Sequence, residues 1–456
     1  MLGYVILLIS LYLYTKSRYR YLSIFLYLSY MMGYLGGFGV WNDIVLGCKT
    51  MDLALMYTAA INAYLIFNKQ WYIPKKSFRK PYVLFGLFLC ASILFSHFHY
   101  GLTFFQILQG GRSFFMILAL PILSRVKYND LIKILRLLFW VCFIESIIYI
   151  LQIFVGRPLL PYLSEFSYDW STGLVRLYNS PANLVFFIII SFIKPDFCPK
   201  SLSINTIRGV LLVALLCTLG RTNIATGIGT LLLAMMINGS FKKVAKTLII
   251  LGICLIPFIG SLSSRFEDGG TSNDLEQIVN GDFGKNYQLQ DDATMTFRLA
   301  ICYERGDYLA QRSLGEKIFG MGLVSDSQPW VLKHYRFRIG LINDETGETN
   351  QLGNPDIAYG NLITYLGFGG MLLYLYMCYS FARYFWDNRK KHYLYMIVAA
   401  QMIMLFVGSF SGVGLSNPQN LSLFFLILSL GADNKAGMAI LNRSITKANI
   451  CRNIVN

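Results

Sequence analysis

Long apolar runs separated by short polar stretches make up most of this chain of 456 residues. Many runs are about 17 to 25 residues long, enough for a helix to cross a hydrocarbon core of about 30 Å. Lipid excludes irregular backbone, so each run predicts a membrane-spanning helix. The pattern predicts an all-α polytopic membrane protein with about 13 transmembrane helices, 12 to 14 being allowed, near residues 2–15, 22–40, 50–68, 81–98, 103–123, 131–155, 180–193, 207–220, 222–237, 244–261, 358–382, 393–413 and 419–432.

A polar insert at about 262–357 is the only extended interruption of this pattern. Ten predicted membrane helices precede it in 1–261, three follow it in 358–432, and a polar tail occupies 433–456. The insert holds most of the acidic residues of the chain together with several arginines. We therefore expect a membrane scaffold that carries one large loop, itself containing helices, on one side of the bilayer.

Composition and charge agree with this picture. Only 14% of the residues are charged, where soluble domains carry about 25%. The net charge of +16 would indicate nucleic acid in a soluble protein, but here the lysines and arginines gather in alternate loops. The positive-inside rule then puts the amino terminus and the large loop outside and the carboxyl terminus in the cytoplasm, and no nucleic-acid partner is expected. The basic loops are 16–20, 69–80, 125–127, 194–200, 242–243 and 389–391.

No metal and no other cofactor are expected. The nine cysteines occur singly, without the Cys-x-x-Cys spacing of a metal site. The four histidines form no ligand cluster in the sequence either.

Two ionisable residues fall inside predicted spans. A charge in the hydrocarbon costs at least about 2.5 kcal/mol, so Arg112 should face protein, water or an anion. Glu145, in a neighbouring span, is a candidate partner for a structural ion pair.

Two short turns place arginines at the outer membrane surface. Arg176 precedes the turn Asn179-Ser-Pro181, which leads into a helix whose first backbone N–H groups would point outward. Arg221 follows Gly220, which breaks the helix, and Thr222 begins the next one. A guanidinium beside a helix amino terminus is a strong phosphate site. The alternatives are an interfacial aromatic belt around Arg176 and a snorkelling Arg221.

Inside the insert, residues 291–312 read as a helix that Gly315 would stop. Arg298, Arg305 and Arg312 recur every seven residues, which predicts three guanidiniums along about 20 Å of one helix face. Glu304 and Asp307 lie among them, and a solvated face with local ion pairs is the alternative.

Asp356 comes just before the eleventh predicted span. It is either the N-cap of that helix or a carboxylate base at the membrane surface.

With these motifs assembled, the chain resembles the O-antigen polymerase (Wzy) and O-antigen ligase superfamily over most of residues 170–375. The resemblance lies in Arg176 before Asn179-Ser-Pro181, in Leu219-Gly-Arg221-Thr, in Phe297-Arg298 followed by Gly320-Met-Gly322, and in Asp356 followed by Tyr365-Leu-Gly367-Phe-Gly369-Gly370. Ligases carry a His-Asn or His-Ser pair where this chain has Asp356-Ile357, which favours a polymerase.

The resemblance implies a GT-C-type glycosyltransferase in the bacterial inner membrane, acting without a metal on undecaprenyl-pyrophosphate-linked oligosaccharides, with a flippase and a chain-length regulator as further partners beside membrane lipid. Arg176, Arg221, Arg298 and Arg305 would hold the pyrophosphate, and Asp356, with Glu304 or Asp307 behind it, would be the catalytic base. The alternatives are a ligase that transfers glycan to an acceptor lipid and a flippase for the same lipid-linked unit.

Overall fold

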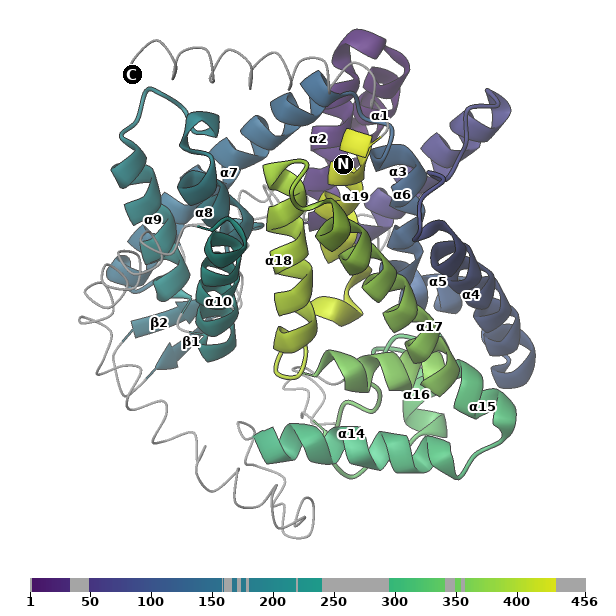
Figure 1. The fold of residues 1–456 in the computed structure, drawn as a ribbon. Helices are drawn as coiled ribbons and strands as arrows, with labels where there is room; N and C mark the ends of the chain where they lie inside the picture. The colour runs from purple at the N-terminus through teal and green to yellow at the C-terminus, as the bar shows by residue number, and fades with distance from the viewer. Residues whose placement is uncertain are drawn as a thin grey trace.

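The computed structural model describes residues 2–32, 49–157, 159, 166–169, 174–177, 180–218, 220–239, 295–340, 349–353 and 357–431, with backbone alone at 166–169, 174–177, 221 and 295–296. Most of them are helical (Figure 1). The helices are α1 (Leu2–Thr15), α2 (Arg20–Met32), α3 (Thr50–Phe67), α4 (Arg79–Tyr100), α5 (Phe104–Phe115), α6 (Leu120–Leu123), α7 (Tyr128–Val155), α8 (Leu184–Ile193), α9 (Ile204–Cys217), α10 (Arg221–Ile237), α14 (Met295–Ala310), α15 (Leu314–Phe319), α16 (Pro329–His334), α17 (Ala358–Asn388), α18 (Tyr393–Gly408) and α19 (Ser422–Ile427).

Five helical segments of the described chain are long and apolar enough to cross a membrane, namely Thr50–Phe67, Arg79–Tyr100, Phe104–Leu123, Tyr128–Val155 and Ala358–Asn388. Six shorter apolar helical segments accompany them. The chain therefore has the character of a helical membrane protein, as its hydropathy predicts. Every expected span overlaps a described helix except 244–261, which lies outside the described residues, so the total of about 13 remains a prediction.

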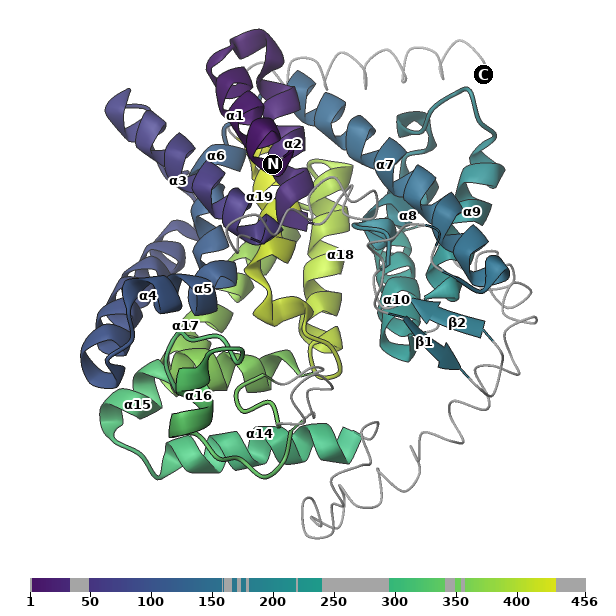
Figure 2. The same cartoon turned by 180° about the vertical axis from the view of Figure 1, so that it is seen from behind.

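The hydropathy pattern did not predict a β-hairpin. Strands β1 (Phe166–Asp169) and β2 (Leu174–Leu177) form an antiparallel hairpin in the segment between α7 and α8, with Phe166 opposite Leu177. The hairpin lies beside the lower end of α10 (Figure 2). A short strand pair in a connecting segment leaves no apolar run for a membrane-length window to detect.

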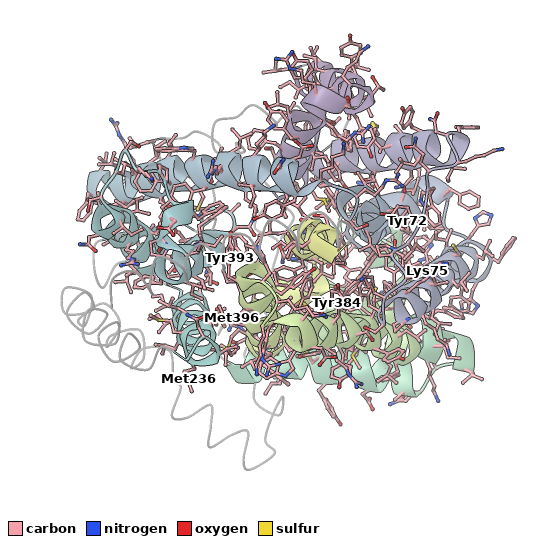
Figure 3. The ribbon with its side chains drawn as sticks, turned by 45° about the horizontal axis from the view of Figure 1, so that its top comes forward. Tyr72, Lys75, Met236, Tyr384, Tyr393 and Met396 are labelled. Carbon is pink, nitrogen blue, oxygen red and sulfur yellow. The ribbon has the colours of Figure 1, made fainter. Side chains whose placement is uncertain are left out.

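The helices run alternately up and down, so their connections collect on two opposite faces. The connections 16–20, 68–78, 124–127, 194–203 and 389–392 lie together on one of them, which we call the basic face. Arg125 donates from Nη1 to the carbonyl of Gln70, and Lys76 Nζ lies 6.0 Å from the ring of Tyr384, so these loops contact one another. Figure 3 turns this face forward and labels Tyr72, Lys75, Tyr384 and Tyr393 on it.

The opposite face carries α14, α15 and α16 as a layer across the ends of the membrane helices (Figure 1). We call residues 295–353, as far as they are described, the loop layer. It packs mainly on α17, which also contacts α4 and α18 and is bent at Gly367. The basic loops read from the sequence, apart from 242–243, which lie outside the described residues, thus gather on one face of the structure.

The helix expected at 291–312 differs in its limits. α14 ends at Ala310, and Gly315, the expected stop, lies inside α15. Ser313 explains the difference, because its side chain accepts from the Glu316 N–H and the Glu316 carboxylate accepts from the Ser313 N–H. This capping box starts a new helix where the sequence pattern suggested a loop.

Candidate functional site

Two adjoining cavities open at the ends of the membrane helices, and residues of the loop layer line one of them. The large pocket, of about 590 Å³, lies between the starts of α8 and α10, the end of α18 and the turn after α18. The small pocket, of about 380 Å³, lies between α5, the start of α17 and the described segments around 325 and 350–353. Val413 lines both pockets, so they are neighbours on the loop-layer side of the membrane helices.

Neutral polar groups and apolar side chains together line the large pocket. Thr222, Thr226 and Thr230 face it from successive turns of α10, and Gln401 faces it from α18. Among the described residues, no side chain of the pocket wall is charged. The Oε1 atom of Gln401 is buried and has no hydrogen-bond partner among these residues. Hydroxyl and amide groups in this arrangement suit a ligand that itself carries many hydroxyls.

Two helix amino termini border the same pocket. Ser180, Pro181 and Asn183 line it just before α8 begins, and Thr222 and Asn223 line it in the first turn of α10. The first N–H groups of a helix lack intrahelical partners and carry partial positive charge. The two turns that the sequence singled out are therefore brought to one cavity.

Close packing holds these two helices together. A Cβ at Gly227 would lie 2.9 Å from a Leu215 methyl carbon and 3.3 Å from one of Val185 in α8, and a Cβ at Gly229 would lie 2.8 Å from the Met404 methyl carbon in α18. Both glycines therefore permit a close approach of α10 to its neighbours.

Arg112 lines the small pocket, but its partner differs from the expected one. Its Nη1 atom lies 3.6 Å from Asp52 Oδ1 on α3, and both side chains are largely buried. Glu145 was the candidate from the sequence, and Asp52 takes that place because α3 packs against α5. Gln109, on the same helix as Arg112, also lines this pocket and accepts a hydrogen bond of 2.6 Å from Gln328 of the loop layer.

The loop layer is joined to the membrane helices through two glycines. Gly320 (φ +80°) and Gly367 (φ +69°) meet so closely that a Cβ on Gly320 would lie 2.6 Å from the Gly367 nitrogen. The Met321 N–H donates to the Thr364 carbonyl at 2.8 Å, and the Tyr100 hydroxyl donates to the Gly320 carbonyl at 2.8 Å. The Gly-x-Gly motif and the glycines of α17 thus form a backbone-to-backbone joint, which only residues without a side chain permit.

Arg305 is a structural residue of the loop layer. Only 1% of it is exposed, so its guanidinium is not available on an accessible helix face, as its proposed role in pyrophosphate binding requires. The guanidinium donates to the carbonyls of Ile339, Asn350 and Gln351 and pairs with Glu304 at 2.7 Å. Burial lowers the pKa of Arg305 to about 10, and the Glu304 carboxylate opposes that shift. The three arginines do not form one face of α14, because Arg305 is buried against the rest of the layer, whereas Arg312 lies beyond the end of α14 and is exposed.

Glu304 is occupied in the same way. Its carboxylate accepts from the N–H groups of Arg338 (2.9 Å) and Ile339 (3.1 Å) as well as from Arg305. A carboxylate that accepts from three donors is held in a fixed position. These contacts favour a structural role for Glu304 over the role of a base that moves protons.

Asp326, which the sequence analysis did not single out, holds the segment that leads toward Asp356. Its carboxylate accepts from the N–H groups of Gln351 (3.0 Å), Leu352 (2.8 Å) and Gly353 (2.6 Å). Hydrogen bonds from a side chain to backbone groups 25 or more residues away leave no local signal in the sequence. Gly353 lines the small pocket, so Asp326 fixes part of its wall.

The remaining candidates are less fully placed. Asp307 accepts a hydrogen bond of 2.8 Å from Gln311 on the open side of α14, and Arg298 is half-buried in the same helix. Arg176 lies on β2 opposite Ser167, and Arg221 is the first residue of α10; only their backbones are described. Asp356 lies outside the described residues.

The sequence matches no protein-family model, and no curated protein matches it. The class of the protein therefore rests on its own fold. It is a helical membrane protein with a folded loop layer on one face and two adjoining pockets on the same side of the membrane helices.

Proposed function

We propose that this chain is a bacterial polysaccharide polymerase of the O-antigen (Wzy) type, which joins undecaprenyl-pyrophosphate-linked repeat units at the periplasmic face of the inner membrane. The observation that carries the proposal is the large pocket, where the starts of α8 and α10 meet. Arg221 begins one of these helices, and Arg176 lies eight residues before the other. Two helix amino termini and neutral hydroxyls around one cavity, with an arginine in or near each of the two turns in the sequence, suit a substrate that is part pyrophosphate and part sugar.

In this mechanism the growing glycan donates its reducing end to a hydroxyl of an incoming lipid-linked unit. The bond from the anomeric carbon to the pyrophosphate oxygen breaks, the acceptor oxygen forms the new bond, and direct displacement inverts the anomeric configuration. Arg176, Arg221 and Arg298 stabilise the departing pyrophosphate by fixed positive charge. Arg305 is left out of this set because its guanidinium is buried on backbone carbonyls.

The acceptor hydroxyl loses its proton to a carboxylate base, and we assign that role to Asp356. Its described neighbours Gly353 and Asn361 line the small pocket, next to the proposed donor site. Glu304 is a weaker candidate because three donors already occupy it. Asp307 remains an alternative on the open side of α14.

The proposed topology has about 13 spans in a GT-C-type arrangement, with the loop layer in the periplasm and the carboxyl terminus in the cytoplasm. The gathering of lysine- and arginine-rich connections on the face opposite the loop layer supports this orientation.

The polymerase, the ligase and the flippase leave different products in cells that lack the gene. A strain without a polymerase accumulates single repeat units on its lipids, and wild-type protein restores the long polymer. Arg221→Ala should restore no polymer while inserting in the membrane at the normal level, with Arg383→Ala, an exposed arginine on α17, as the matched control. Finished polymer left on undecaprenyl pyrophosphate would identify a ligase, and units trapped on the cytoplasmic side would identify a flippase.

A further inference from the structure

A third cavity, of about 350 Å³, lies on the basic face and plays no part in the proposed reaction. Its walls are the third turn of α7 and the connection between α8 and α9, at the corner that α7, α8 and α9 form in Figure 2. Arg136 and Trp140 line it from α7, and Asp196, Cys198 and Lys200 line it from the connection. We call it the basic pocket.

The charges around the basic pocket leave a positive excess. Arg136 and Lys200 are exposed and enter no ion pair among the described residues. Asp196 is the acidic residue of the wall, and its Oδ2 atom pairs with Lys194 Nζ at 3.1 Å, so its charge is balanced from outside the pocket. A guanidinium and an ammonium converging on one cavity provide a bidentate donor and a point charge for phosphate oxygens.

An apolar stripe continues from the pocket along α7. Trp140, Ile144, Ile147 and Leu151 are all exposed and recur at helical spacing, so they lie on the same face as Arg136. This face runs from the basic pocket toward the middle of the membrane helices. Tryptophan at the upper end of such a stripe is typical of the boundary between head groups and hydrocarbon.

We propose that the basic pocket binds the head group of an anionic phospholipid whose acyl chains lie along the apolar stripe of α7. Arg136 and Lys200 hold the phosphate, and the Trp140 ring packs at the level of the glycerol backbone. Basic pockets between membrane helices on the cytoplasmic side are known to hold anionic lipid head groups. A soluble phosphate ion would use the same two cations but would gain nothing from the stripe.

The test uses the purified full-length chain in a neutral detergent. The midpoint of thermal unfolding is titrated with phosphatidylglycerol, with phosphatidylcholine of the same acyl chains, and with sodium phosphate. Phosphatidylglycerol should raise the midpoint in a saturable way, while the other two should leave it unchanged. Arg136→Gln should weaken the apparent affinity about tenfold, and the double variant with Lys200→Gln about a hundredfold.

Arg383→Gln is the matched control, because Arg383 is an exposed arginine on α17, away from the pocket, and should bind like the wild type. Asp196→Asn removes the acidic group from the wall and should tighten the binding of phosphatidylglycerol. This result would show that lipid affinity follows the local charge. Equal stabilisation by phosphatidylcholine, an equal effect of phosphate alone, or wild-type affinity in the double variant would each overturn the proposal.

Discussion

Replacing Gly320 with alanine should detach the loop layer from the membrane helices. The new Cβ would lie 2.6 Å from both the Gly367 nitrogen and the Thr364 carbonyl oxygen, and these are backbone atoms that no rotamer change can move. Gly320 also has a φ of +80°, a backbone conformation that residues with a Cβ rarely adopt.

The cost follows from these contacts. The unfavourable φ contributes about 1 to 2 kcal/mol. Relief of the overlap requires separation of the two backbones, which breaks the hydrogen bonds from Met321 to Thr364 and from Tyr100 to Gly320. Each is worth about 1 kcal/mol. The docked state should therefore lose about 3 kcal/mol, or about two orders of magnitude in the ratio of docked to undocked protein.

Limited trypsin digestion of the full chain in detergent measures this ratio, because cleavage of a transiently opened segment follows its population. Cleavage after the exposed Arg312 should be about a hundredfold faster in Gly320→Ala. Gly101→Ala is the matched control: Gly101 has φ of +67°, but a Cβ there meets nothing within 4 Å. If the two variants are cleaved at the same rate, backbone contact between Gly320 and Gly367 does not hold the layer in place.

Three further predictions concern stability. Asp326→Asn should weaken the loop layer by about 2 to 4 kcal/mol, because a neutral amide replaces a carboxylate that accepts three N–H groups; unchanged amide hydrogen exchange at 351–353 would contradict this. Glu304→Gln should reduce the free energy of unfolding by about 3 kcal/mol and so lower the unfolding midpoint, since Arg305 stays buried without its counter-charge. Asp307→Asn should leave the midpoint unchanged. Burial lowers the pKa of His392 from 6.5 to about 4, so the folded protein keeps the ring neutral. Stability should then be complete above about pH 6.5 and fall by up to about 3 kcal/mol as the pH drops toward 4; His392→Asn should flatten this part of the profile.

The membrane helices could be predicted from the sequence because lipid imposes one rule on every span, a long apolar run. The glycine motifs could also be recognised. Gly320 and Gly367 occupy positions where a Cβ does not fit, so the close contact requires glycine, and glycine is visible in the sequence. These features depend on local composition, which a single sequence records.

What could not be predicted depends on contacts between distant segments. The spacing of Arg305 indicates a helix face but not whether that face meets water or the carbonyls of residues 339–351. Likewise, nothing near Arg112 points to Asp52, 60 residues earlier, as its partner. Asp326 was missed because its three donors lie 25 to 27 residues further along the chain.

The polymerase proposal is tested most directly with purified protein in lipid vesicles. Lipid-linked repeat units isolated from a strain lacking the gene are added to wild-type, Asp356→Asn and Arg221→Ala protein in the presence of a metal chelator, and the products are separated on a gel. The account predicts a ladder of multiples of the repeat unit with wild-type protein and single units with both variants. A wild-type reaction that leaves only single units, or an equal ladder from Arg221→Ala, would contradict it.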